Sequence, residues 1–192
     1  EQQAKYIRYL KAYGSLTKLF NQKGASSIPH LDSKFQETVY AKSFDSKVID
    51  KGNTPHDIKS TFGSEPFAIG IKTWISSKPS FQKVMQLKAF QEKIVELRDD
   101  PESLVQFICE KRNEKLRQDY EIHGIQEGNS IYHYVTRDAN SLSLHECPYM
   151  PSNTDKLRVD KKRLKSSSIQ WKDGRKKYKF TFGDCQIWQH FD

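Results

Sequence analysis

Residues 67–75, with the sequence FAIGIKTWI, form an apolar run that contains a single charged side chain, Lys72. The run is rich in β-branched and aromatic residues and follows a segment of turn formers, which predicts a buried β-strand. Burying an unpaired ammonium costs several kcal/mol or shifts its pKa. We therefore expect Lys72 either to reach solvent or to have a function at the end of this strand.

The length of 192 residues predicts a single domain covering 1–192. Only 35% of the residues are hydrophobic, but 12% are aromatic, and aromatic side chains bury the most area per residue. The expected fold class is α/β (α+β), with a mixed β-sheet core flanked by helices and a C-terminal β-hairpin region. Residues 1–125 are expected to be rich in helix, and residues 126–192 to be rich in strands and basic side chains.

The periodicity of apolar residues predicts the helices and the shorter strands. Helices are expected over 3–20 with a break at Gly14, from Asp32 or Ser33 to 44 with Gln36 as a capping-box partner, from Ser80 to 97, and from Asp100-Pro101 towards Gly124. Short strands are expected over 130–138 and 141–150.

Residues 167–182 predict a β-hairpin with the two-residue turn Asp173-Gly174. In this register Lys172 faces Arg175, Trp171 faces Lys176 and Ile169 faces Tyr178. An apolar face is then formed by Ile169, Trp171, Tyr178, Phe180 and Phe182. The opposite, basic face carries Lys172, Arg175, Lys177 and Lys179.

The net charge of +8 is concentrated in one segment. Residues 156–179 contain eleven Lys or Arg and two Asp, a charge of +9, so the rest of the chain sums to −1. Such a cluster is typical of a surface that binds a polyanion, although a merely solvated lysine-rich face is the alternative.

The three cysteines, Cys109, Cys147 and Cys185, are far apart and odd in number, which indicates a reducing compartment rather than a disulfide framework. A zinc site of His145, Cys147, Cys185 and His190 is disfavoured, because the close ligand pairs typical of zinc are mostly missing. No run approaches the roughly 18 apolar residues of a membrane helix, and no secretory signal is present. We expect a cytoplasmic protein without a membrane partner, and, since the first residue is not Met, a missing N-terminal piece.

Two carboxylates precede the strand that contains Lys72. Asp57 lies in TPHD, in the turn-rich segment, and Glu37 lies in the preceding helix. Carboxylates at such a strand edge can hold a divalent metal, while a nearby lysine orients the attacking water or stabilises developing charge. A solvated lysine, a turn aspartate and a surface glutamate are the alternatives for each residue alone, and His56 is expected to be an exposed turn residue.

The combination TPHD…GIKTW resembles the PD-(D/E)xK nuclease superfamily, which contains many type II restriction endonucleases. The resemblance covers roughly residues 32–95 and implies a restriction-endonuclease-like core. Asp57 then matches the first acid, Lys72 the lysine, the main-chain carbonyl of Ile71 a metal ligand, and Glu37 the helix glutamate of the metal shell. Gly70 stands where the family has its second acid, so Glu37 or Glu65 is expected to replace it.

The resemblance implies an Mg²⁺-dependent, site-specific endonuclease that cleaves double-stranded DNA as a homodimer. The catalytic core would lie in residues 1–125, with 126–192 as a DNA-binding subregion. DNA contacts are expected from the basic segment, namely from Lys161, Lys162, Arg163, Lys165, Lys172, Arg175, Lys177 and Lys179. The alternatives are a non-catalytic nucleic-acid-binding protein with a degenerate nuclease core, and a structure-specific repair nuclease.

Overall fold

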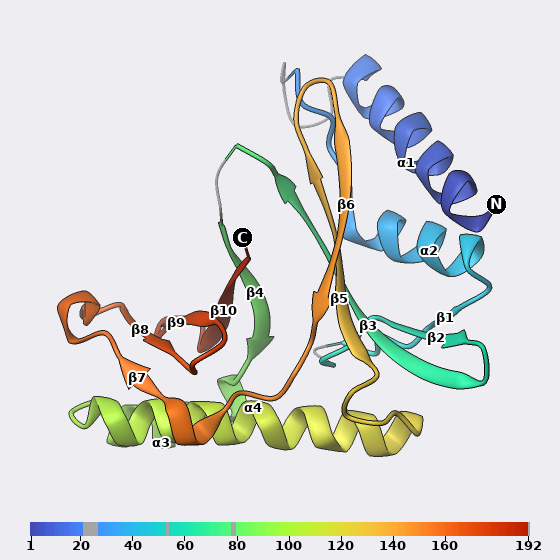
Figure 1. Cartoon of the computed structure of the whole chain (residues 1–192). Helices are drawn as coiled ribbons and strands as arrows, with labels where there is room; N and C mark the ends of the chain where they lie inside the picture. Colours follow the sequence, from blue (N-terminus) through green and yellow to red (C-terminus); the bar gives the residue numbers. More distant parts are fainter. Residues whose placement is uncertain (21–26, 53, 78–79, 192) are drawn as a thin grey trace. The chain divides into compact units, whose positions relative to one another are not determined.

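The computed structural model describes residues 1–20, 27–52, 54–77 and 80–191 (Figure 1). The chain has a mixed α+β fold that divides into two compact units, each with a five-stranded sheet. The first unit comprises Glu1–Gly52, His56–Lys78 and Tyr120–Met150, and the second Asn53–Pro55, Pro79–Asp119 and Pro151–Asp192. Both units draw on residues from each side of position 125, so the expected helix-rich and strand-rich parts do not coincide with them.

The sheet of the first unit is mixed, with strand order β1-β2-β3-β5-β6. Its strands are β1 (Lys47–Val48), β2 (Ile58–Phe62), β3 (Glu65–Ile75), β5 (Ser130–Arg137) and β6 (Leu142–Pro148). β3 and β5 are parallel and the other neighbours are antiparallel. The predicted strands near 67–75, 130–138 and 141–150 are confirmed, whereas β2 lies in a segment that was expected to consist of turns. Gly63, with a φ of 63°, closes the β2–β3 hairpin.

Two helices pack on this sheet, α1 (Gln2–Leu19) and α2 (Ser33–Ser43). Their buried side chains share a core with the sheet that includes Tyr6, Leu10, Val39, Tyr40, Ile58, Ile69, Ile71 and Val135. The predicted break at Gly14 is wrong: α1 is continuous, and a Cβ at Gly14 would lie 3.2 Å from Cβ of Pro29, so the glycine allows close packing. Asp32, one of the two predicted caps, caps α2. The alternative capping box of Ser33 and Gln36 is wrong, because Ser33 is the first helical residue and the Gln36 amide donates to the hydroxyl of Tyr6.

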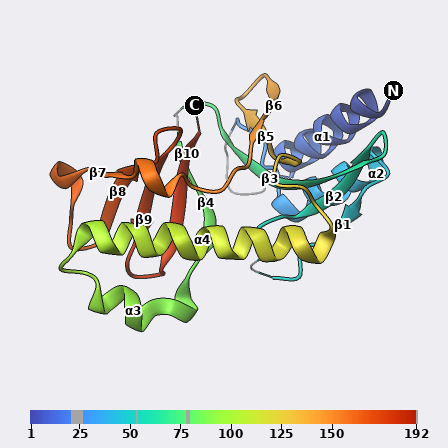
Figure 2. The same ribbon diagram turned by 60° about the horizontal axis from the view of Figure 1, so that its bottom comes forward.

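The second unit has an antiparallel sheet with strand order β4-β10-β9-β8-β7 (Figure 2). Its strands are β4 (Ser80–Gln86), β7 (Arg158–Val159), β8 (Ser168–Lys172), β9 (Lys177–Thr181) and β10 (Gln186–Phe191). Its helical segments are η1 (Lys88–Phe90), α3 (Gln91–Glu96), η2 (Thr154–Lys156), η3 (Lys161–Arg163) and most of α4 (Pro101–His123). As predicted, α4 starts at Pro101, with the Asp100 carboxylate accepting from the N–H of Ser103, and ends before Gly124. In the described residues, no helix combines the length and apolar character that crossing a membrane requires.

The predicted helix from Ser80 to 97 is wrong over its first half. Residues 80–86 form β4, which pairs with β10, and only 91–96 are α-helical. Val84, Met85 and Leu87 are buried in this arrangement. Pairing with a distant strand therefore outweighs a weak helical periodicity, as tertiary contacts often do.

The hairpin of β8 and β9 exists, but its predicted register is shifted by two residues. Lys172 pairs with Lys177 and Trp171 with Tyr178, leaving residues 173–176 as the loop. The buried carboxylate of Asp173 accepts from the N–H groups of Arg175 and Lys176, which favours this wider turn. A shift of two residues leaves each strand residue on its predicted side of the sheet. The predicted apolar face is therefore confirmed for Ile169, Trp171, Tyr178 and Phe180, which are all buried.

Candidate metal and catalytic site

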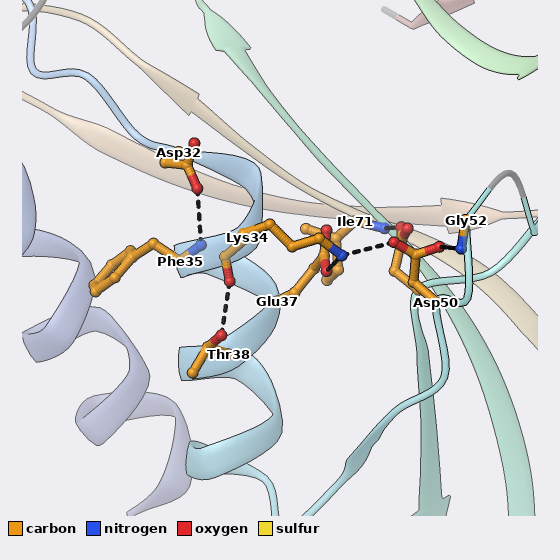
Figure 3. A network of polar contacts seen from close by, with 9 residues as sticks. Asp32, Lys34, Phe35, Glu37, Thr38, Asp50, Gly52 and Ile71 are labelled. Carbon is orange, nitrogen blue, oxygen red and sulfur yellow. Dashed lines mark hydrogen bonds and ion pairs between the residues drawn. The ribbon is translucent and has the colours of Figure 1, made fainter.

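Three carboxylates of the first unit lie close together: Glu37, Asp50 and Asp57. Figure 3 shows Glu37 and Asp50 on either side of the Lys34 ammonium. One oxygen from each lies within 4.8 Å of the others. Glu37 is buried on α2, Asp50 follows β1, and Asp57 directly precedes β2. Oxygen donors in such a group suit a hard divalent cation such as Mg²⁺ or Ca²⁺.

Asp57 is held at the edge of β3, where that strand extends past the start of β2. Its main-chain N–H donates to the carbonyl of Ile69 at 3.0 Å. Its Oδ2 accepts from the N–H of Ile71 at 2.5 Å, which replaces a strand partner at this position. Because the N–H and C=O of a strand residue point to the same edge, the Ile71 carbonyl is directed to the side of Asp57.

Glu37 and Asp50 are joined by a lysine side chain. Nζ of Lys34 lies 2.9 Å from Oε2 of Glu37 and 2.6 Å from Oδ2 of Asp50. These two hydrogen bonds raise the pKa of Lys34. The Lys34 side chain is 65% exposed. Its ammonium therefore neutralises part of the negative charge of the cluster and can turn away into solvent.

Asp50 is the site residue that the sequence analysis missed. It lies in an ordinary turn context, with its Oδ1 accepting from the N–H of Gly52 at 2.9 Å. Turn aspartates of this kind are common, so no local signal distinguishes Asp50 from them. Glu65, the alternative considered for the missing acid, is exposed at the start of β3 and does not belong to the cluster.

Gly70 is explained by packing rather than by the loss of a site residue. A Cβ at this position would lie 2.9 Å and 3.0 Å from ring atoms of Tyr132 and 3.3 Å from the ring of Tyr149. These two tyrosine rings are stacked, with their centroids 3.8 Å apart. A carboxylate side chain cannot be placed at position 70 without displacing them.

Lys72 is half-buried on the same face of β3 as Gly70. Its charge lowers the pKa of Asp57 and partly opposes the effect of burial. Burial is the largest influence on both acids and raises the pKa of Asp57 and of Glu37 above their ordinary values. The negative charge of Asp50 raises both further, so the cluster favours either protons or a cation.

These raised pKa values predict that rising pH destabilises the metal-free protein at this site. Glu37 and Asp57 bind protons more tightly in the folded chain than in the unfolded chain. Their contribution to the free energy of unfolding is therefore complete below about pH 4. It is lost as pH rises through the raised pKa values. Mg²⁺ binds the deprotonated carboxylates, so its stabilising effect should grow over the same range.

Thermal unfolding in EDTA and in Mg²⁺ measures both effects. Other acids, such as Glu146 and Asp138, have lowered pKa values and affect the pH dependence of Tm in the opposite direction. The difference in Tm between wild type and Asp57→Asn cancels their effect and leaves that of the site. In EDTA this difference should fall with rising pH, and in Mg²⁺ it should rise. A Mg²⁺ effect that does not change with pH would contradict the assignment.

The predicted DNA-binding residues belong to the second unit. They fall into two groups, those outside the paired strands β8 and β9 and those on these strands. Lys161 pairs with Glu102, Arg163 with Asp160, and the guanidinium of Arg175 donates to the carbonyl of Pro151. Lys162 lies in η3, and Lys165 forms an isolated bridge with Ser168. By contrast, Lys172, Lys177 and Lys179 lie on the sheet itself.

The remaining sequence candidates form no further site. In the residues that the structure describes, the carboxylate cluster is the one group with metal-binding geometry, and all three cysteines are free thiols. His56 is fully buried rather than exposed, with Nε2 2.7 Å from Oγ of Ser130. No protein-family model, curated protein or solved structure matches the chain.

Proposed function

We propose that the protein is a metal-dependent nuclease that hydrolyses phosphodiester bonds in DNA. The observation that carries the proposal is the cluster of Glu37, Asp50 and Asp57 beside the charge of Lys72. The restriction-endonuclease-like core, the site-specific cleavage of double-stranded DNA, the homodimer and the cytoplasmic location are parts of the same proposal that come from the resemblance alone.

The residues present fit Mg²⁺, because three carboxylates that share negative charge offer hard oxygen ligands. Glu37, Asp50 and Asp57 would hold the ion, with the Ile71 carbonyl directed to the same edge. A bound Mg²⁺ supplies an activated water and stabilises charge on the phosphodiester oxygens. Asp50 thereby provides the carboxylate that the family places at the position of Gly70.

The chain's own groups have separate tasks in this proposal. The N–H of Ile71 orients the Asp57 carboxylate through their hydrogen bond. The ammonium of Lys72, near Asp57, would donate to the attacking water or to a phosphate oxygen. The basic residues of the second unit would bind the DNA backbone, which provides affinity and salt dependence but little sequence recognition.

Incubation of supercoiled plasmid with the protein in Mg²⁺ and in EDTA tests the proposal. Discrete fragments in Mg²⁺ would support a site-specific endonuclease of the restriction type. Cleavage confined to branched or nicked DNA would favour a repair nuclease. DNA binding without any cleavage would leave a non-catalytic nucleic-acid-binding protein with a degenerate core, and would contradict the nuclease assignment.

A further inference from the structure

The sheet of the second unit has one buried face and one solvent-facing face. Trp171, Tyr178 and Phe180 are buried, so the alternate residues on these strands point to the opposite side. Strand pairing continues this side onto β10 and β4, where Lys179 pairs with Trp188 and Trp188 pairs with Lys83. We call it the outer face and define it by Phe81, Lys83, Lys172, Lys177, Lys179 and Trp188.

Aromatic and basic side chains alternate on the outer face. Nζ of Lys179 lies 5.1 Å from the ring centroid of Phe81 and 5.2 Å from that of Trp188. The indole N–H of Trp188 donates to Oγ1 of Thr181 at 3.2 Å, which fixes the orientation of the ring. Both rings thus lie within cation–π distance of the same ammonium.

The positive charges of the outer face favour the binding of an anionic partner. Lys172 lies directly opposite Lys177 in the β8–β9 ladder, and like charges in this position destabilise a sheet. Asp160, whose main-chain N–H donates to the carbonyl of Gln170 beside this face, is paired with Arg163 rather than with these lysines. Lys172 and Lys177 also line two cavities of about 430 Å³ and 360 Å³. A polyanion that follows this face would relieve the repulsion.

We propose that the outer face binds single-stranded nucleic acid, with bases stacked on Trp188 and Phe81 and phosphates near the lysines. Aromatic side chains on an antiparallel sheet are suited to stacking unpaired bases. A duplex offers its phosphates but hides the faces of its bases, so it would leave both rings unused. The proposal does not depend on the carboxylate cluster, and in a nuclease it would favour DNA that contains an unpaired stretch.

Fluorescence anisotropy with a labelled oligo(dT) of about 12 nucleotides, in EDTA, tests the proposal. Wild type should bind the single strand more tightly than a duplex of equal length or an abasic strand. Trp188→Leu should weaken single-strand binding roughly tenfold to a hundredfold and change abasic-strand binding little. Lys177→Gln should weaken binding to both strands and reduce their salt dependence.

Matched variants separate stacking from loss of folding. Trp188→Phe retains a ring and should retain most of the affinity, whereas Phe20→Leu removes an exposed ring of the first unit and should have no effect. Glu65→Gln, which removes an exposed carboxylate of the first unit, should bind as wild type does. The measurement in EDTA requires no cleavage, so a failed nuclease assignment leaves this test intact. The proposal is overturned if folded Trp188→Leu binds the single strand normally, or if the duplex binds as tightly as the single strand.

Discussion

Replacing Asp57 by asparagine should reduce Mg²⁺-dependent cleavage of plasmid DNA by roughly a hundredfold to a thousandfold, the usual cost of losing one preorganised group that stabilises the transition state. Asparagine keeps an oxygen that accepts the N–H of Ile71, so the local backbone should be retained. It removes the negative charge that would bind the metal. Lys72→Gln should cause a comparable loss, because it removes the ammonium near that carboxylate.

Two control variants keep this comparison specific. Glu65→Gln removes an exposed carboxylate from the same strand as Lys72, and Lys11→Gln removes an exposed ammonium from α1. Both should cleave at the wild-type rate, measured as initial rates of plasmid nicking with far-UV circular dichroism as the check of folding. Equal activity of Asp57→Asn and wild type would contradict the catalytic role of Asp57.

Replacing Gly70 by glutamate, which restores the acid of the family pattern, should prevent folding rather than increase activity. Even alanine places a Cβ 2.9 Å from the ring of Tyr132, and overpacking of this kind costs about 1–3 kcal/mol. Glutamate adds a carboxylate to this packed position, and its burial costs several kcal/mol more. The total approaches the whole stability of a typical domain, which is about 5–15 kcal/mol.

Urea unfolding measures the effect of Gly70→Ala, and the soluble yield measures that of Gly70→Glu. Gly128→Ala is the matched control, since no atom lies within 4 Å of its added Cβ and its φ is not positive. It should change the free energy of unfolding by less than about 0.5 kcal/mol. A stable Gly70→Glu protein with increased cleavage would show that position 70 still belongs to the metal site.

The fold was predictable where local patterns agree with the tertiary structure. The strand at 67–75, the Asp32 cap and the start of α4 all follow from residue types and spacing. β4 was missed because its backbone hydrogen bonds are made with β10, at the far end of the chain. β2 was missed because its segment is rich in turn formers, although it pairs with the adjacent strand β3 in a hairpin. The hairpin register failed because the carboxylate of Asp173 stabilises a wider turn than the Asp-Gly pair predicts.

The candidate site was predictable in part for the same reason. Glu37, Asp57 and Lys72 could be singled out because they occur in the order of a known motif. Asp50 could not, because it reaches the cluster only through the tertiary placement of β1 next to β2. The packing that requires a glycine at position 70 could not be predicted either. The rings that exclude a side chain there belong to Tyr132 and Tyr149, which follow Gly70 by more than sixty positions in the sequence.

Binding of Mn²⁺, followed by electron paramagnetic resonance at pH 7.5, tests the central claim most directly, since it needs no DNA and no turnover. Mn²⁺ accepts the same oxygen ligands as Mg²⁺. Wild type and Glu65→Gln should bind one ion, and Asp50→Asn and Asp57→Asn should each lose most of the affinity. Absence of binding in wild type, or unchanged affinity in folded Asp50→Asn, would contradict a metal centre built from Glu37, Asp50 and Asp57.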